Sequence, residues 1–133
     1  MAAVVADTHA LLWYLLQPER LSAAAKSAFV DAAQDGDPVY LSAISLVEIR
    51  YLIEKAKLVE ADLQFLINAL NNPVHQLVVA RVDYAIALEV GRVPRHIVPD
   101  MPDRIIAATA LSLDVPLVTR DQRIRQALAK TIW

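Results

Sequence analysis

Short apolar runs alternate along the chain with longer segments in which apolar side chains recur every three or four positions. The apolar run at residues 2–6 predicts a buried strand, and the periodic segment after it predicts a helix that ends before Pro18. Strands that alternate with helices favour a parallel sheet covered on both faces. Further strands are predicted at residues 38–42, 75–82, 115–119 and 131–133.

Capping residues mark where the predicted helices begin and end. The helix in residues 21–37 has Ser22 as its N-cap and Gly36 just past its end. The next helix reaches residue 58, and either Ser42 or Ser45 can be its N-cap. Because helix outweighs strand, the pattern predicts an α/β fold with a small, mainly parallel sheet flanked by helices. The remaining predicted helices lie at residues 60–72, 83–93, 101–114 and 120–129.

Composition narrows the classes of protein that fit this pattern. Hydrophobic residues make up 56% of 133 residues, which suits one packed domain over residues 1–133. The chain has no Cys, which excludes disulfides, thiolate zinc sites and a cysteine nucleophile and fits a reducing cytoplasm. Two Gly exclude a glycine-rich phosphate loop. No membrane span is expected, because no apolar run is long enough. No signal peptide is expected, because Asp7 and His9 interrupt the apolar start and no basic region precedes it.

The formal net charge is −2. Two of the acids lie at or just beyond the ends of predicted strands. Asp7 comes after the strand at residues 2–6, and Asp121 comes two residues after the strand at 115–119. Each can serve simply as the N-cap of the helix that follows. The carboxyl ends of parallel strands share one edge of a sheet, where ligands gather. Two acids delivered to that edge therefore indicate a site as well as two caps.

Glu48 is unusual because its helical neighbours at three and four residues are mostly apolar. It can close a capping box with Ser45, but if Ser42 is the N-cap it lies two turns into the helix. An ionised carboxylate on a buried face needs a partner, because an unpaired one costs several kcal/mol or takes up a proton. A metal ion or an arginine would provide that partner.

Asp100 and Asp103 surround the start of a helix that opens with Pro102. Asp100 suits the N-cap, and Asp103 suits the first turn, where an acid interacts favourably with the helix dipole. Asp103 also shares a helical stripe with apolar residues that should pack on the sheet, namely Ile106, Ala107, Ala110 and Leu111. We therefore expect Asp100 mainly to cap the helix and Asp103 to reach the site.

Several carboxylates at one edge would repel one another unless a cation neutralised them. Oxygen ligands without cysteine suit a hard divalent ion, Mg²⁺ or Mn²⁺, which activates water and stabilises charge on a phosphodiester. Arg104 and Arg120 each sit beside one of these acids and are candidate phosphate contacts, with surface or acid-pairing roles as the alternative.

The motifs "DTHALLW", "SLVEI", "PDRIIAATAL" and "LVTRD", in this order and over essentially the whole chain, resemble PIN-domain ribonucleases. More narrowly, the chain resembles the VapC-type toxins of VapBC toxin–antitoxin pairs. The resemblance implies a three-layer PIN-like fold and an endoribonuclease that cleaves RNA with Mg²⁺ or Mn²⁺. The implied ligands are Asp7, Glu48, Asp103 and Asp121, and the implied supporting polar residues are Thr8, Ser45 and Thr119.

The resemblance also implies partners, and at one position the sequence differs from the family pattern. VapC-type toxins form homodimers and bind a small cognate antitoxin that blocks the acidic site, and the helices in residues 9–21 and 45–58 are candidates for those contacts. Many relatives carry Asp or Asn two residues after the fourth acid, where this chain has Arg123. That difference places a second metal ion in question, with Asp100 as a candidate replacement for the missing charge.

Two other functions fit parts of the sequence. One is a PIN-like interaction module that lacks catalysis, in which the acids serve only as caps; divalent-ion binding would distinguish it from a nuclease. The other is a phosphatase of the dehalogenase type, which also has Asp after its first strand. That chemistry needs a second Asp two residues later, and His9 occupies this position.

Overall fold

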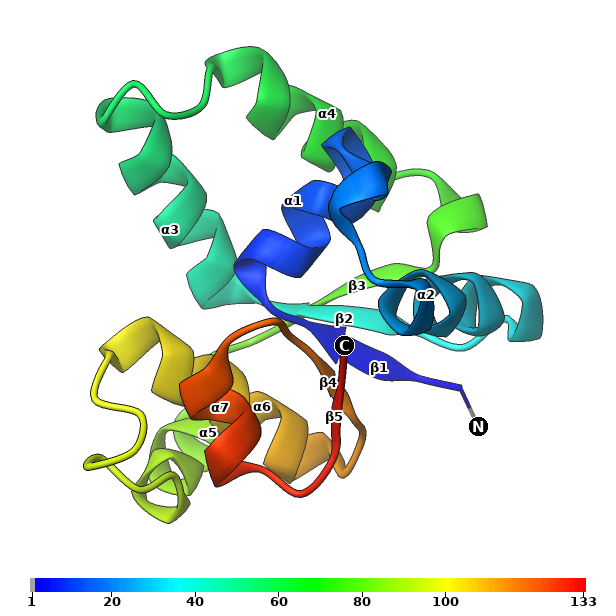
Figure 1. Cartoon of the computed structure of the whole chain (residues 1–133). Coiled ribbons are helices and arrows are strands. Elements are labelled where there is room, and N and C mark those ends of the chain that lie inside the picture. The colour runs from blue at the N-terminus through cyan, green and yellow to red at the C-terminus, as the bar shows by residue number, and fades with distance from the viewer. Residues whose placement is uncertain (1) are drawn as a thin grey trace.

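The computed structural model describes residues 2–133, and its centre is a five-stranded sheet in the order β3-β2-β1-β4-β5 (Figure 1). Every neighbouring pair of strands is parallel. This confirms the predicted parallel α/β architecture, in which helices return the chain from one strand to the next. The strands are β1 (Val4–Ala6), β2 (Val39–Ser42), β3 (Leu77–Ala80), β4 (Leu117–Val118) and β5 (Thr131–Ile132).

Seven α-helices and three short 3₁₀ turns connect these strands within the described residues. Helix α2 begins after the N-cap Ser22 and ends at Gly36, whose left-handed φ of 70° closes the helix as predicted. The α-helices are α1 (Thr8–Leu16), α2 (Ala23–Asp35), α3 (Ala43–Glu54), α4 (Glu60–Leu70), α5 (Tyr84–Glu89), α6 (Met101–Leu113) and α7 (Gln122–Ala127). The 3₁₀ turns are η1 (Pro18–Arg20), η2 (Pro73–His75) and η3 (Val90–Arg92).

Helices cover both faces of the sheet, and alternate strand residues belong to different cores. In β1, Val4 and Ala6 pack with α1, α2, α3 and α4, whereas Val5 packs with α5, α6 and α7. Figure 1 shows the same division, with α1, α3 and α4 on one side of the sheet and α5, α6 and α7 on the other. Continuous apolar strands such as these are typical of a sheet that is buried on both faces.

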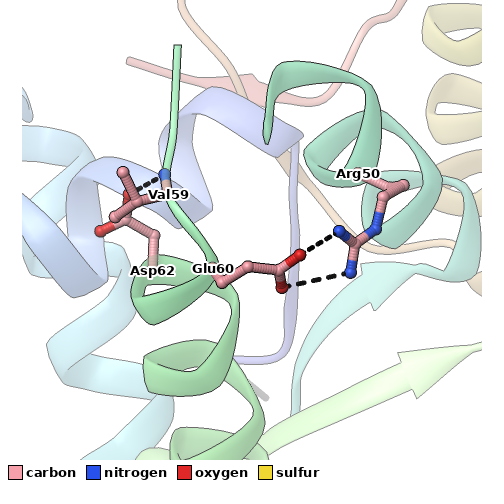
Figure 2. A network of polar contacts seen from close by, with 4 residues as sticks. All are labelled: Arg50, Val59, Glu60 and Asp62. Atoms are coloured by element: carbon pink, nitrogen blue, oxygen red, sulfur yellow. Dashed lines mark hydrogen bonds and ion pairs between the residues drawn. The ribbon is translucent and has the colours of Figure 1, made fainter. Parts of the chain in front are cut away.

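Polar contacts fix the turn between α3 and α4 (Figure 2). Arg50 in α3 forms an ion pair with Glu60, the first residue of α4. Asp62 accepts a hydrogen bond at 3.0 Å from the backbone N–H of Val59, which stabilises the start of α4. Helix α4 lies beside α1, and both helices pack over the same face of the sheet.

The structure decides between the two possible N-caps of α3. Ser42 is the cap, and its hydroxyl accepts a hydrogen bond from the backbone N–H of Ile44 at 3.2 Å. The alternative, a capping box formed by Ser45 and Glu48, is wrong, because Ser45 lies inside the helix and is fully buried. No helix in residues 2–133 is long and apolar enough to cross a membrane.

Candidate active site

Five acids from four separate parts of the chain line one pocket at the carboxyl edge of the sheet. The pocket has a volume of about 360 Å³. Strand β1 lies between β2 and β4, so the segments that follow these strands meet at this edge. All four acids predicted from the sequence therefore come together. The lining residues are Asp7, Thr8, His9, Trp13, Glu48, Asp100, Asp103, Arg120 and Asp121.

Asp7 is the most buried acid of the pocket, and both of its carboxylate oxygens accept hydrogen bonds. One oxygen caps α1 through the backbone N–H of Ala10 at 2.8 Å, and the other accepts from the hydroxyl of Thr119. Burial raises the pKa of Asp7, and these hydrogen bonds oppose the shift. Thr119 also accepts from the backbone N–H of Asp121 at 3.0 Å, so one hydroxyl joins the ends of β1 and β4.

Glu48 is held by a chain of two hydroxyl groups. Thr8 donates to the Oε1 atom of Glu48 at 2.6 Å, and the Oγ atoms of Thr8 and Ser45 are 2.8 Å apart. A hydroxyl has one hydrogen to donate, so the Ser45 hydroxyl must donate to Thr8 while Thr8 donates to the carboxylate. Burial raises the pKa of Glu48, and the bond from Thr8 lowers it in part. Thr8 and Ser45 are thus positioned to orient an acid.

Asp100 and Asp103 approach the same space from the start of α6. Asp100 caps the helix as predicted, accepting from the backbone N–H of Asp103 at 3.2 Å. Asp100 is also part of the acidic cluster, because carboxylate oxygens of Glu48, Asp100 and Asp103 all lie within 4.8 Å of one another. Asp100 thus combines the cap that was mainly expected of it with a place among the acids, and its role as a metal ligand stays a prediction.

Asp103 has a strongly raised pKa, because it is partly buried among the other acids of the pocket. Burial, followed by repulsion from Asp100 and then from the other acids, raises its pKa to about 7. Asp7 and Glu48 are shifted in the same direction, mainly by burial. Such a cluster favours a cation, and its ligands are oxygens only, which is the donor set of hard divalent ions such as Mg²⁺ and Mn²⁺.

This electrostatic penalty predicts how the stability of the metal-free protein depends on pH. Unfolded Asp103 would release its proton near pH 3.8, whereas the folded protein retains it up to about pH 7. Between these values the folded state binds more protons, so raising the pH lowers the free energy of unfolding. In EDTA, the melting temperature should fall as the pH rises from about 4 to about 7. Asp103→Asn should reduce this fall, and an unchanged pH slope in that variant would contradict the assignment.

The two arginines expected near phosphate have different roles. Arg120 is exposed and lines the acidic pocket, as a phosphate contact should. Arg104 does not line it, because its guanidinium donates to the backbone carbonyls of Val90 and Val93 at 3.0 and 2.9 Å. Arg104 thus ties α6 to the turn after α5, and the expectation that it contacts substrate finds no support in this geometry.

His9 and Trp13 line the pocket although the sequence did not single them out as site residues. They are four residues apart in α1, so they lie on one face of the helix, and their ring centroids are 5.9 Å apart. The sequence feature that could have identified them is their position in the first turns of the helix after Asp7. Helix α1 otherwise contributes mostly buried apolar residues, whereas α3 exposes Val47 and Tyr51 beside the site.

Comparison with known proteins agrees with this geometry. The family model of the PIN domain matches residues 4–129. Among curated proteins, the chain is 30% identical over 125 residues to "Ribonuclease VapC22" of Mycobacterium tuberculosis, a match that covers 94% of this chain and 92% of the relative. The family match gives no support to the dehalogenase-type alternative.

Solved structures show the same fold at low sequence identity. VapBC2 from Rickettsia felis, in a crystal structure with a DNA fragment from its promoter, aligns with a TM-score of 0.72 and 15% identity over 98% of this chain and 99% of that one. FitAcB from Neisseria gonorrhoeae aligns with a TM-score of 0.58 and 22% identity over 96% and 95%. The order of the motifs, the parallel sheet and the family match agree, and the chain belongs to the PIN domain family.

Proposed function

We propose that this protein is a metal-dependent endoribonuclease and the toxin of a type II toxin–antitoxin pair. The observation that carries the proposal is the convergence of acids on one pocket, with Glu48, Asp100 and Asp103 close enough to share an ion. The likeness to a curated VapC ribonuclease supports RNA as the substrate. The chain shares its fold with proteins in toxin–antitoxin assemblies of known structure, which supports the toxin role.

The donor set fits Mg²⁺ or Mn²⁺. The proposed ligands are Asp7, Glu48, Asp103 and Asp121, together with Asp100, and every donor is a carboxylate oxygen. When bound, such an ion lowers the pKa of a coordinated water and stabilises charge on a phosphodiester. The hydroxyls of Thr8 and Thr119 orient Glu48 and Asp7, and Arg120 is placed to hold a phosphate oxygen of the strand.

The direct test is incubation of the purified protein with total cellular RNA, with Mg²⁺ and with EDTA, followed by mapping of the cut ends. The proposal expects discrete cuts that require the metal. A protein that binds Mn²⁺ without cutting RNA, or binds no divalent ion at all, would instead be the interaction module that lacks catalysis.

Expression in a bacterial host gives a prediction for the toxin role. The wild-type protein should arrest growth, because RNA cleavage stops translation, and co-expression of the neighbouring small open reading frame should restore growth. We infer that this antitoxin and a second toxin copy use apolar side chains such as Val47 and Tyr51, which are 49% and 59% exposed on α3. Normal growth of cells that express the wild-type protein alone would contradict the toxin role.

The hydroxyl chain to Glu48 gives a further prediction. Thr8→Val keeps the shape of the side chain but removes the donor, so the pKa of Glu48 should rise further and its metal affinity should fall. We expect Mn²⁺ affinity and cleavage rate each to fall roughly 10-fold. This is the low end of the roughly 10- to 100-fold loss that follows removal of a residue that orients a metal ligand. Thr8→Ser retains the donor and should recover most of both quantities, measured by Mn²⁺ titration and RNA cleavage. Equal losses in the two variants would contradict the role of the hydroxyl.

A further inference from the structure

A second cavity adjoins the acidic pocket and shares His9 and Trp13 with it. Its volume is about 530 Å³, within the range of pockets that hold small ligands. Its walls come from α1, the turn η1, and the segment between the end of α3 and the start of α4. Leu12, Trp13, Leu16, Leu52 and Leu58 supply apolar surface, and His9, Gln17, Arg20, Lys57 and Asp62 supply polar groups.

Two of the five polar residues of this cavity are cationic, and Asp62 is the one carboxylate among them. Arg20 and Lys57 are exposed, and neither forms an ion pair with a carboxylate anywhere in residues 2–133. The carboxylate of Asp62 accepts from the backbone N–H of Val59 at the start of α4 (Figure 2). The cavity therefore presents two positive charges without a carboxylate partner, together with the carboxylate of Asp62, beside apolar surface.

Trp13 connects the two pockets through its neighbours. The guanidinium of Arg20 lies 4.5 Å from the centre of the Trp13 ring, and that of Arg120 lies 5.8 Å away. Arg20 lines the second cavity and Arg120 lines the acidic pocket. Cation–π attraction to an indole that is only 9% exposed holds both arginines at defined positions. One buried side chain thus lies between two arginines, one at each pocket.

We propose that this second cavity binds the nucleotide next to the scissile phosphate of a single-stranded RNA, an inference that rests on the proposed nuclease function. Arg20 and Lys57 hold the phosphate, and the base packs on the guanidinium plane of Arg20 and the leucine side chains. Proteins that hold single strands combine a positively charged groove with planar or apolar surfaces on which bases stack. A strand engaged by Arg120 at the acids passes His9 and Trp13 and enters this cavity.

A protein segment is the competing occupant, since a peptide with apolar and acidic side chains would meet the same surface. The shared wall with the acidic pocket favours the RNA strand. A strand whose scissile phosphate lies at the acids must continue into neighbouring surface, and the second cavity adds free positive charge at that point.

Binding of a fluorescein-labelled single-stranded RNA of mixed sequence tests the proposal. The protein is the full chain carrying Asp103→Asn, in EDTA, so that the strand is not cut. Arg20→Ala should weaken binding roughly 5- to 10-fold and lower the slope of log affinity against log salt by about one. Lys57→Ala should weaken binding about 3-fold with a similar change of slope. Arg20→Lys retains the positive charge but lacks the planar guanidinium, so its RNA affinity should lie between those of the wild type and Arg20→Ala.

Arg81→Ala is the matched control, because Arg81 is exposed and lines neither pocket. The proposal is overturned if Arg20→Ala and Lys57→Ala bind RNA as tightly as Arg81→Ala. If they also loosen the complex with the co-purified antitoxin, the cavity is a peptide site. The nuclease function is tested separately. A wild-type protein that does not cut RNA but binds it through Arg20 would retain the cavity assignment and lose the nuclease.

Discussion

Asp103→Asn should abolish RNA cleavage while making the metal-free protein more stable. The pKa of Asp103 is raised to about 7, because the side chain is partly buried and faces Asp100 and the other acids. Removing its charge relieves this repulsion but also removes a proposed metal ligand. We expect cleavage to fall at least about 100-fold, the scale seen when one electrostatic group of an active site is lost. RNA cleavage, Mn²⁺ titration and the melting temperature in EDTA at pH 7.5 measure the three effects.

Asp83→Asn is the matched control for this change. Asp83 caps α5 through the backbone N–H of Ile86 at 3.0 Å and lies outside the acidic pocket. Asparagine can still cap a helix, so this variant should keep its stability, its metal affinity and its cleavage rate. Full RNA cleavage by purified Asp103→Asn protein would show that the pocket is not the catalytic centre.

Asp100→Ser should lower metal affinity strongly while leaving the helix intact. Serine replaces the N-cap of α6 but removes the charge that lies within 4.8 Å of the oxygens of Glu48 and Asp103. We expect a 10- to 100-fold loss of Mn²⁺ affinity, on the order found when groups around a metal site are altered. Asp100→Ala should show the same loss and an additional roughly 0.5–2 kcal/mol of destabilisation from the missing cap.

The corresponding variants of Asp83 separate capping from metal binding. Asp83→Ala removes an N-cap of the same geometry, so it should lower the melting temperature without changing the Mn²⁺ titration. If Asp100→Ser titrates like the wild type, Asp100 is a cap alone and the ion is held by the remaining acids. Chemical denaturation and Mn²⁺ titration of these variants measure the two contributions independently.

Much of the architecture could be predicted because its causes are local. Pro18 ends the first helix region, Ser22 and Gly36 bound α2, and apolar runs mark the five strands. Alternation of strands and helices then predicts a parallel sheet, since right-handed crossovers restrict the topology. Where two local signals competed, as for Ser42 and Ser45, the sequence left both open, and packing of the helix decided for Ser42.

Those acids of the candidate site that follow the ends of strands could be predicted from the sequence. Asp7 and Asp121 follow β1 and β4, which are neighbours in the sheet, so they meet at one edge. Glu48 and Asp103 were indicated by carboxylates on otherwise apolar helical faces, and both line the same pocket. These predictions depend on periodicity, which relates residues within one element and requires no knowledge of distances between elements.

Contacts between elements depended on the tertiary structure alone. The sequence by itself determined the strands, the helix caps other than that of α3, and the supply of acids to one edge of the sheet, because backbone propensity and side-chain period are local properties. The packing of α6 against α3 brought Asp100 into the cluster with Glu48. The packing of α6 against η3 turned Arg104 toward the carbonyls of that segment, and the packing of α1 against α3 set Ser45 against Thr8. Whether an acid such as Asp100 only caps its helix or also reaches the ion depends on its distance from Glu48, and residues far apart in the sequence set that distance.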